Sequence, residues 1–234
     1  MSESGARFAL VNPDWTFKGS TYFGCHDPHI PLELMYARDQ IRRAGHDVLL
    51  VDAHINHLSL EEARRIVCDF APDFLVIPTA PTYLFWRCPP PELRVPQEWF
   101  KGIGGSAMKV AIGPHASATP AATMRKTACD VAMRGEPDFT LSQLAAKPWS
   151  EIDGCCYRSV NGAEHISASL GVAPMKELEV IDFSDYPVEL HSHRHHVFQG
   201  HGCGAELEFA RGCPWACTAA NFICSSSAAH TANS

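Results

Sequence analysis

Two cysteines near the end of the sequence have the spacing of a metal-binding loop. Cys213 and Cys217 form a C-x-x-x-C pair within RGCPWACT, directly after a strand-like run, LEFA. Thiolates this close in sequence, on a loop that leaves a strand, can bind one metal ion or an iron–sulfur cluster. Because an isolated C-x-x-x-C pair is a weak signal, the surrounding RGCPWAC sequence carries most of this prediction.

Two other candidate metal sites lie in the same region. Imidazoles two residues apart in an extended segment can share an ion, and the run HSHRHH with a nearby histidine provides His191, His193, His195, His196 and His201. No carboxylate or cysteine stands at a defined spacing from them, so we favour a solvated linker. Four cysteines could also bind zinc, namely Cys203, Cys213, Cys217 and Cys224, but their C-x9-C-x3-C-x6-C spacing matches no common zinc motif.

A second kind of candidate site lies in four loops rich in Gly, Pro, Ser and Thr. They follow four strand-like runs and read NPDWTFKGSTYFGCHDPH, PTAPTY, GPHAS and GEPDFT. Small residues let backbone groups approach a bulky ligand, and hydroxyls can hydrogen-bond its amides or phosphate. No G-x-G-x-x-G follows the first run and no P-loop motif occurs, whereas the length of the first loop suits a large, flat cofactor. Trp86 and Trp99 flank a Pro-rich loop at 88–96 without helical periodicity, and they could cover the pocket mouth or pack on the sheet edge.

Alternating strands and helices must position these loops. Strands are predicted at 7–13, 47–53, 74–79, 108–113 and 130–134, and helices at 31–45, 58–70 and 120–126. This alternation predicts βαβ units and a parallel sheet. Five strands in this length favour a doubly wound, Rossmann-like or flavodoxin-like sheet over an eight-stranded barrel. In such a sheet, the four loops after strands one, three, four and five meet at the carboxyl edge.

Composition separates this α/β region, 1–146, from a linker subdomain at 147–204 and a C-terminal segment at 205–234. The linker contains a predicted hairpin, CCYRSV and AEHISA, around a type I′ turn at Asn161–Gly162.

The chain has 234 residues, 46% of them hydrophobic, and a net charge of −7. These values exclude wholesale disorder and argue against a nucleic-acid partner, because no basic stripe is present. No apolar run is long enough to span a membrane and the N-terminus does not resemble a signal peptide, so we expect a cytoplasmic protein.

Several segments together resemble one protein family. RGCPWACT is similar to the start of the radical S-adenosylmethionine (SAM) signature, in which three cysteines spaced C-x-x-x-C-x-x-C bind a [4Fe–4S] cluster. Upstream, 42–53, 110–120 and 131–144 resemble the N-terminal cobalamin-binding domain of B12-dependent radical SAM proteins. The segments 152–162 and 181–190 resemble the bridge between the two domains of that family. The ordered match covers nearly all of 6–218.

The resemblance implies a Rossmann-like domain that holds cobalamin, with its nucleotide tail at the sheet edge. The cofactor-binding residues that it implies are Asn12, Thr79, Gly113, Pro114, His115, Ser117, Gly135, Glu136 and Thr140. For His115, cofactor contact and capping of the following helix both remain open. Cys213 and Cys217 would bind the cluster. The D-x-H-x-x-G cobalt-ligand motif of other B12 proteins is absent, so no axial histidine is assigned.

The chain departs from the family at the cluster. Ala220 stands at the third cysteine position and Ala219 at that of an aromatic residue, and a complete barrel would need about 200 more residues. We therefore expect a truncated, cobalamin-binding module without radical SAM activity of its own. Its expected partner is the corrinoid cofactor, and the sequence does not indicate a protein partner. One alternative is an active enzyme, of the methyltransferase type, completed by missing sequence or a partner chain. The other is an inert fragment without ligand.

Overall fold

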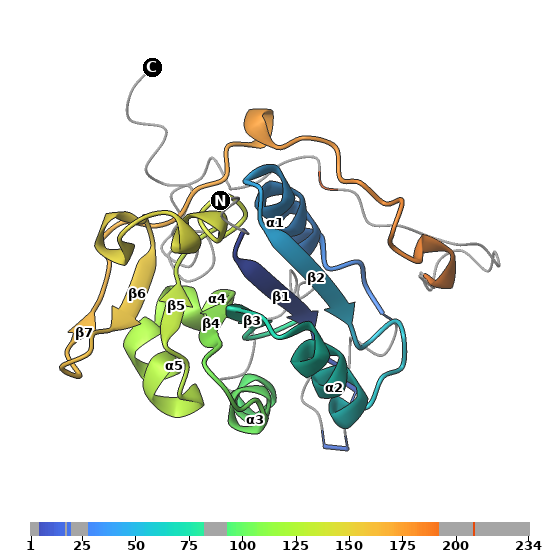
Figure 1. Cartoon of the computed structure of the whole chain (residues 1–234), viewed down its shortest axis with the longest axis horizontal. Coiled ribbons are helices and arrows are strands. Elements are labelled where there is room, and N and C mark those ends of the chain that lie inside the picture. Colours follow the sequence, from blue (N-terminus) through green and yellow to red (C-terminus); the bar gives the residue numbers. More distant parts are fainter. Residues whose placement is uncertain (1–4, 17, 20–27, 82–92, 192–207, 209–234) are drawn as a thin grey trace.

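The computed structural model describes residues 5–16, 18–19, 28–81, 93–191 and 208. One sheet runs through it, in the strand order β2-β1-β3-β4-β5-β6-β7 (Figure 1). The strands are β1 (Arg7–Asn12), β2 (Asp47–Asp52), β3 (Phe74–Pro78), β4 (Met108–Ile112), β5 (Val131–Met133), β6 (Cys155–Arg158) and β7 (Glu164–His165). The first five are parallel, β6 is antiparallel to β5, and β7 is antiparallel to β6. The predicted α/β fold is confirmed.

Helices cover both faces of the sheet. They are α1 (Leu32–Arg43), α2 (Leu60–Phe70), α3 (Arg94–Gly102), α4 (Pro114–Ala118) and α5 (Pro120–Thr127). Figure 1 shows α1 on one side of the sheet and α2, α3 and α5 on the other. Alternate residues of β1 pack on opposite sides, with Phe8 and Leu10 in the core beneath α1. Ala9 and Val11 belong to the core under α2, α3 and α5. Burial on both faces explains why the strands read as continuous apolar runs rather than alternating ones.

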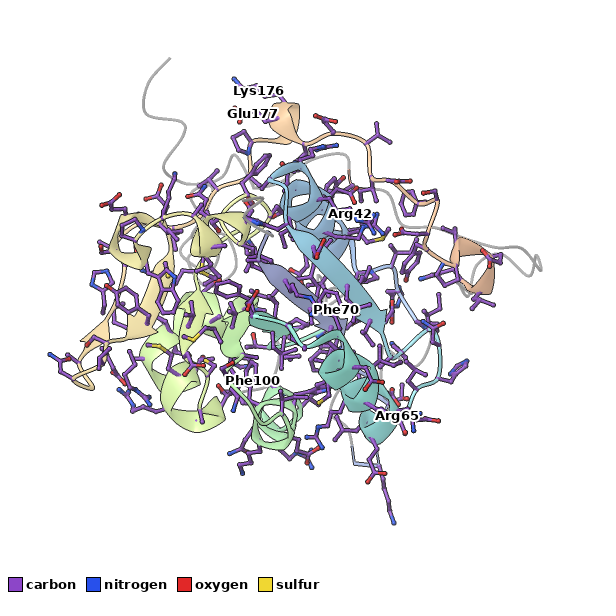
Figure 2. All side chains as sticks on the ribbon, in the orientation of Figure 1. Arg42, Arg65, Phe70, Phe100, Lys176 and Glu177 are labelled. Carbon is purple, nitrogen blue, oxygen red and sulfur yellow. The ribbon has the colours of Figure 1, made fainter. Side chains whose placement is uncertain are left out.

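One helix lies where the sequence analysis expected irregular structure. Residues 94–102 form α3, so the predicted loop through residue 96 is wrong for its described part. Pro96 is the third residue of this helix, in the first turn, where no intrahelical partner for its missing N–H is needed. Trp99 and Phe100 are buried in the core, and Phe100 extends from α3 toward the sheet (Figure 2). Trp99 therefore packs on the sheet rather than covering a pocket mouth.

The predicted hairpin exists, but its turn is of a different type. Gly162 has a positive φ of 84° whereas Asn161 does not, so the turn is not type I′, which needs positive φ at both central residues. Ser159 closes a three-residue loop instead, since its N–H donates to the carbonyl of Ala163 and its carbonyl accepts from Gly162. The Asn161 side chain accepts from the N–H of Ala163 and takes part in this closure.

A capping box begins α2, as the sequence LSLEE indicates. The Ser59 hydroxyl accepts from the backbone N–H of Glu62 at 3.2 Å, and the Glu62 carboxylate accepts from the N–H of Ser59 at 3.0 Å. The Ser59 hydroxyl and N–H hold the pKa of Glu62 below its ordinary value of 4.5. Two orphan donors of the first turn are thereby satisfied.

We expect Ser59→Ala to lower the free energy of unfolding by about 1 kcal/mol at neutral pH, because the N-cap acceptor is lost. Folding lowers the pKa of Glu62. The stabilisation by its ionised carboxylate is therefore fully present above the ordinary pKa of 4.5 and is lost as the pH falls through the pKa of the folded state. Urea unfolding followed by circular dichroism should therefore give a smaller difference at about pH 3 than at neutral pH. Ser59→Thr keeps the hydroxyl and is the control. Equal losses for the two variants would contradict a role for the cap.

Candidate functional site

The strand order places a topological switch point between β1 and β3. The chain leaves β1 toward β2 on one side and, after α2, returns to β3 on the other side of β1. Ligands of open α/β sheets bind outside the carboxyl ends of the strands at such a point. Asn12, Thr79 and Gly113 stand at the carboxyl ends of β1, β3 and β4, and the Gly135 loop follows β5. We call this side of the sheet the carboxyl edge.

Thr79 connects the ends of β3 and β4. Its fully buried hydroxyl donates to the carbonyl of Ile112 at 2.8 Å and accepts from the N–H of His115 at 3.2 Å. Gly113 has a positive φ of 91°, and a Cβ there would lie 3.1 Å from the Thr79 hydroxyl oxygen. The Thr79 side chain is therefore used within the protein, where it fixes the start of α4.

His115 and Pro114 belong to α4, which the sequence analysis did not predict. Pro114 is the exposed first residue of this helix, and the His115 side chain is half-buried. The backbone carbonyl of His115 accepts from the N–H of Thr119 at 2.9 Å and from the hydroxyl of Thr123 at 3.0 Å. His115 thus joins α4 to α5 through its backbone.

Ser117 links the loops that follow β4 and β5. Its hydroxyl oxygen accepts from the N–H of Gly135 at 3.0 Å, and its carbonyl accepts from the Arg134 guanidinium at 3.2 Å. In the contact with Gly135 the serine is the acceptor, so its own O–H proton can be donated to a ligand. Ser117 is half-buried and is therefore accessible at the carboxyl edge.

Glu136 and Thr140 face a segment that sequence reasoning did not include. The Glu136 carboxylate accepts from the N–H of Ala173 at 2.8 Å, and its backbone N–H donates to the carbonyl of Gly171. The buried Thr140 hydroxyl lies 3.5 Å from the carbonyl of Pro137. Glu136 therefore positions the loop after β5 against the 171–173 segment, and the Thr140 hydroxyl bonds within that loop. A direct cofactor contact through them remains a prediction.

Asn12 belongs to a buried cluster around Asp52, a residue that the sequence analysis placed within a strand and gave no role. The Asn12 amide donates to Asp52 at 3.0 Å and accepts from the Trp15 indole N–H at 3.3 Å. Asp52 also accepts from the hydroxyl of Tyr186 at 2.8 Å and from the N–H of Ile55 at 3.1 Å. Burial raises the pKa of Asp52, and these donors partly oppose the rise. Asp52 is the last residue of β2, as Asn12 is the last residue of β1. This shared position at the end of a strand was the sequence signal that could have indicated Asp52 as part of the site.

The predicted metal ligands lie outside the described residues. This applies to Cys203, Cys213, Cys217 and Cys224, and to every histidine of the candidate histidine site except His191, which is buried. Trp86, the other tryptophan beside the Pro-rich loop, also lies outside the described residues. Within the described ranges, no three His, Cys, Asp or Glu side chains are grouped so that they could hold a metal ion. Burial raises the pKa of Cys155 to about 12 and that of Cys129 to about 11, so both thiols stay protonated at neutral pH.

Similar proteins were found among solved structures and curated sequences. The methyltransferase TsrM from Kitasatospora setae, a radical S-adenosylmethionine enzyme with cobalamin and a [4Fe–4S] cluster bound, matches with a TM-score of 0.55 at 17% identity, over 75% of this chain and 31% of TsrM. The cobalamin-dependent radical enzyme OxsB, with aqua-cobalamin and S-adenosylmethionine bound, matches with a TM-score of 0.54 at 15% identity, over 72% of this chain and 23% of OxsB. The chain shares the fold of a region of cobalamin-dependent radical SAM enzymes. The predicted resemblance is confirmed at the level of fold.

One curated sequence is also similar to part of the chain. An uncharacterized methyltransferase of Pyrococcus horikoshii is 31% identical over 115 residues, which are 49% of this chain and 24% of that protein. No family model matches the chain. The chain spans between about a quarter and a third of the length of these cobalamin-dependent radical SAM enzymes and of the methyltransferase. Within the part that the structure describes, no helix has both the length and the apolar character needed to cross a membrane.

Proposed function

We propose that this chain is the cobalamin-binding module of a B12-dependent radical SAM protein. The observation that carries the proposal is the fold match to TsrM and OxsB, both of which hold cobalamin in their solved structures. The switch point between β1 and β3 supports the carboxyl edge as the place where the corrinoid binds.

The residues at the carboxyl edge fit a large, flat ligand. Gly113 and Gly135 both have positive φ, and the absence of a Cβ lets Thr79 and Gly171 lie directly against them, which sets the shape of the edge. Pro114, His115 and Ser117 extend this surface as the accessible part of α4. The bound corrinoid would supply cobalt-centred group-transfer chemistry.

The polar groups of the edge have different roles. Ser117 has an O–H proton available for an amide or phosphate oxygen of the cofactor. The hydroxyl of Thr79 and the amide of Asn12 already have partners within the protein, and they would hold the loops in place beneath the ligand. Ser117 is therefore the residue whose side chain we expect to contact the corrinoid.

The test is to mix the full chain with hydroxocobalamin, desalt it and record the visible spectrum. We expect corrin absorbance to co-elute at about one equivalent per chain. Ser117→Trp should abolish this retention by filling the edge, and Ser117→Ala should weaken it. Val160→Trp introduces the same side chain at the fully exposed tip of the hairpin and is the matched control. A folded but colourless wild-type protein, or equal retention by the Ser117 variants, would overturn the proposed site.

An active radical enzyme is the second candidate. The curated relative from Pyrococcus horikoshii is named a methyltransferase, which favours this class of reaction for a longer protein. Cys213 and Cys217 would then be two of the cluster ligands, as the sequence resemblance implies. Formation of 5′-deoxyadenosine from S-adenosylmethionine by the reconstituted, reduced chain would support this candidate. Its absence, in a preparation that retains iron, would exclude radical chemistry by this chain alone.

A further inference from the structure

The segment that follows the hairpin lies against the body of the molecule. We call residues 179–191 the arm. Figure 1 shows its course past α1 and along the side of β2, one of the two edge strands of the described sheet. Ile181 and Tyr186 of the arm form a small apolar cluster with Met35 of α1 and with Ile30 and Ile55. The arm is therefore packed on the domain.

Charged and polar contacts fix the arm along α1. Arg38 is 1% exposed, and its guanidinium donates to Asp185 at 2.7 Å and to the backbone carbonyl of Asp182. Asp39 accepts from Arg38 at 2.8 Å and from the N–H of Asp182 at 2.9 Å. Arg42, labelled in Figure 2, pairs with the other oxygen of Asp185. These contacts determine where the chain runs immediately before Tyr186.

Tyr186 connects the arm to the buried cluster at the carboxyl edge. Its hydroxyl donates to Asp52 Oδ2 at 2.8 Å, and both residues are at least 94% buried. The other carboxylate oxygen of Asp52 accepts from the Asn12 amide, and Asn12 accepts from Trp15. Two consecutive hydrogen bonds thus lead from the arm to Asn12 at the end of β1, where the cofactor is proposed to bind, and a third continues to Trp15.

Apolar packing is incomplete around this connection. A hollow of about 370 Å³ lies between β2 and the arm, and its wall includes Leu50, Asp52, Tyr186 and Pro187. Tyr186 is nonetheless 6% exposed and belongs to the apolar cluster, so packing and the hydrogen bond to Asp52 both hold it. The hydroxyl–carboxylate bond is the polar contact that joins Tyr186 directly to Asp52.

We propose that Tyr186 is a positioning residue for the carboxyl edge and couples docking of the arm to occupation of that edge. This inference rests on the proposed cobalamin function. Without the tyrosine hydroxyl, Asp52 Oδ2 is buried without this donor, although Oδ1 still accepts from the N–H groups of His54 and Ile55. The loss of a donor to a buried carboxylate weakens the cluster that includes the Asn12 amide. Because coupling between two sites is reciprocal, a ligand that favours the ordered edge also favours the docked arm.

The test compares the full chain with Tyr186→Phe in a titration with hydroxocobalamin. We expect the Kd to rise about tenfold. Tyr157→Phe removes a hydroxyl from β6, beyond β5 at the other end of the sheet, and should leave the Kd unchanged. Hydrogen exchange is the second readout: saturating hydroxocobalamin should slow exchange in the 179–191 peptides of the wild type but not in those of Tyr186→Phe. A residue that merely supported the fold would lower the melting temperature without this loss of ligand-dependent protection.

The outcomes separate the two proposals. If the wild type binds the corrinoid and Tyr186→Phe binds it equally well with the same protection of the arm, the coupling is wrong and the binding function stands. If the folded wild type binds no hydroxocobalamin, the proposed function fails and the coupling fails with it. Weaker binding by Tyr186→Phe with loss of arm protection, and no change in Tyr157→Phe, supports both proposals.

Discussion

Replacing Gly135 with alanine is expected to lower the free energy of unfolding by at least about 3 kcal/mol. Gly135 has a φ of 81°, and a Cβ there would lie 2.3 Å from the carbonyl oxygen of Gly171. The segments that contain Gly135 and Gly171 cannot move apart easily, because the backbones of Arg134 and Glu136 are both hydrogen-bonded to the backbone of Gly171. The substitution therefore combines left-handed strain with overlap against a fixed backbone. Urea unfolding monitored by circular dichroism measures the loss.

Gly162 provides the matched control for this prediction. Its φ of 84° is nearly the same, but nothing lies within 4 Å of a Cβ built there, at the tip of the hairpin. Gly162→Ala should cost only the left-handed strain, about 1 kcal/mol. Equal losses at the two positions would mean that the Gly171 backbone yields to a methyl group, and that the contact between these loops is not a rigid part of the carboxyl edge.

The main elements could be predicted from the sequence because both faces of the sheet are buried. The five parallel strands begin and end within one residue of their predicted bounds, since their continuous apolar runs stop where the loops begin. The helix Arg94–Gly102 was missed because Pro96 and the prolines before it suggested irregular structure. Proline in a first turn does not interrupt a helix, and the buried Trp99 and Phe100 were the signal in its favour.

The candidate site was predicted only at the level of its loops. The sequence could not show that the Asn12, Thr79 and Glu136 side chains already have partners, because those partners lie 40, 33 and 37 residues away along the chain. The contact between Tyr186 and Asp52 spans 134 residues. Resemblance placed this part of the arm in a bridge between domains but did not indicate which buried group it meets. Pairings of this kind follow from the sheet order, which local patterns do not determine.

Replacing Arg38 with alanine should lower the free energy of unfolding by about 3 kcal/mol and release the arm. The change leaves Asp39 buried without its cation and removes the donor to the carbonyl of Asp182. Removing one partner of a buried ion pair is costly because the other charge stays desolvated. Asp185 is 46% exposed and can be hydrated, which keeps the loss at the lower end of the range for such changes. Urea unfolding measures the loss, and limited proteolysis mapped by mass spectrometry should show cleavage within 179–191.

Arg43 is the control for this effect because it reaches the same arm from the surface of α1. It pairs with Glu179 at 2.6 Å, and the two side chains are 40% and 67% exposed. Arg43→Ala should therefore cost less than about 0.5 kcal/mol and leave the arm resistant to protease. Arg38→Met tests the role of charge at constant bulk, since it leaves Asp39 without a cation but retains much of the packing. If Arg38→Ala and Arg43→Ala behave alike, the buried guanidinium does not fix the course of the arm, and its apolar cluster and remaining hydrogen bonds hold it.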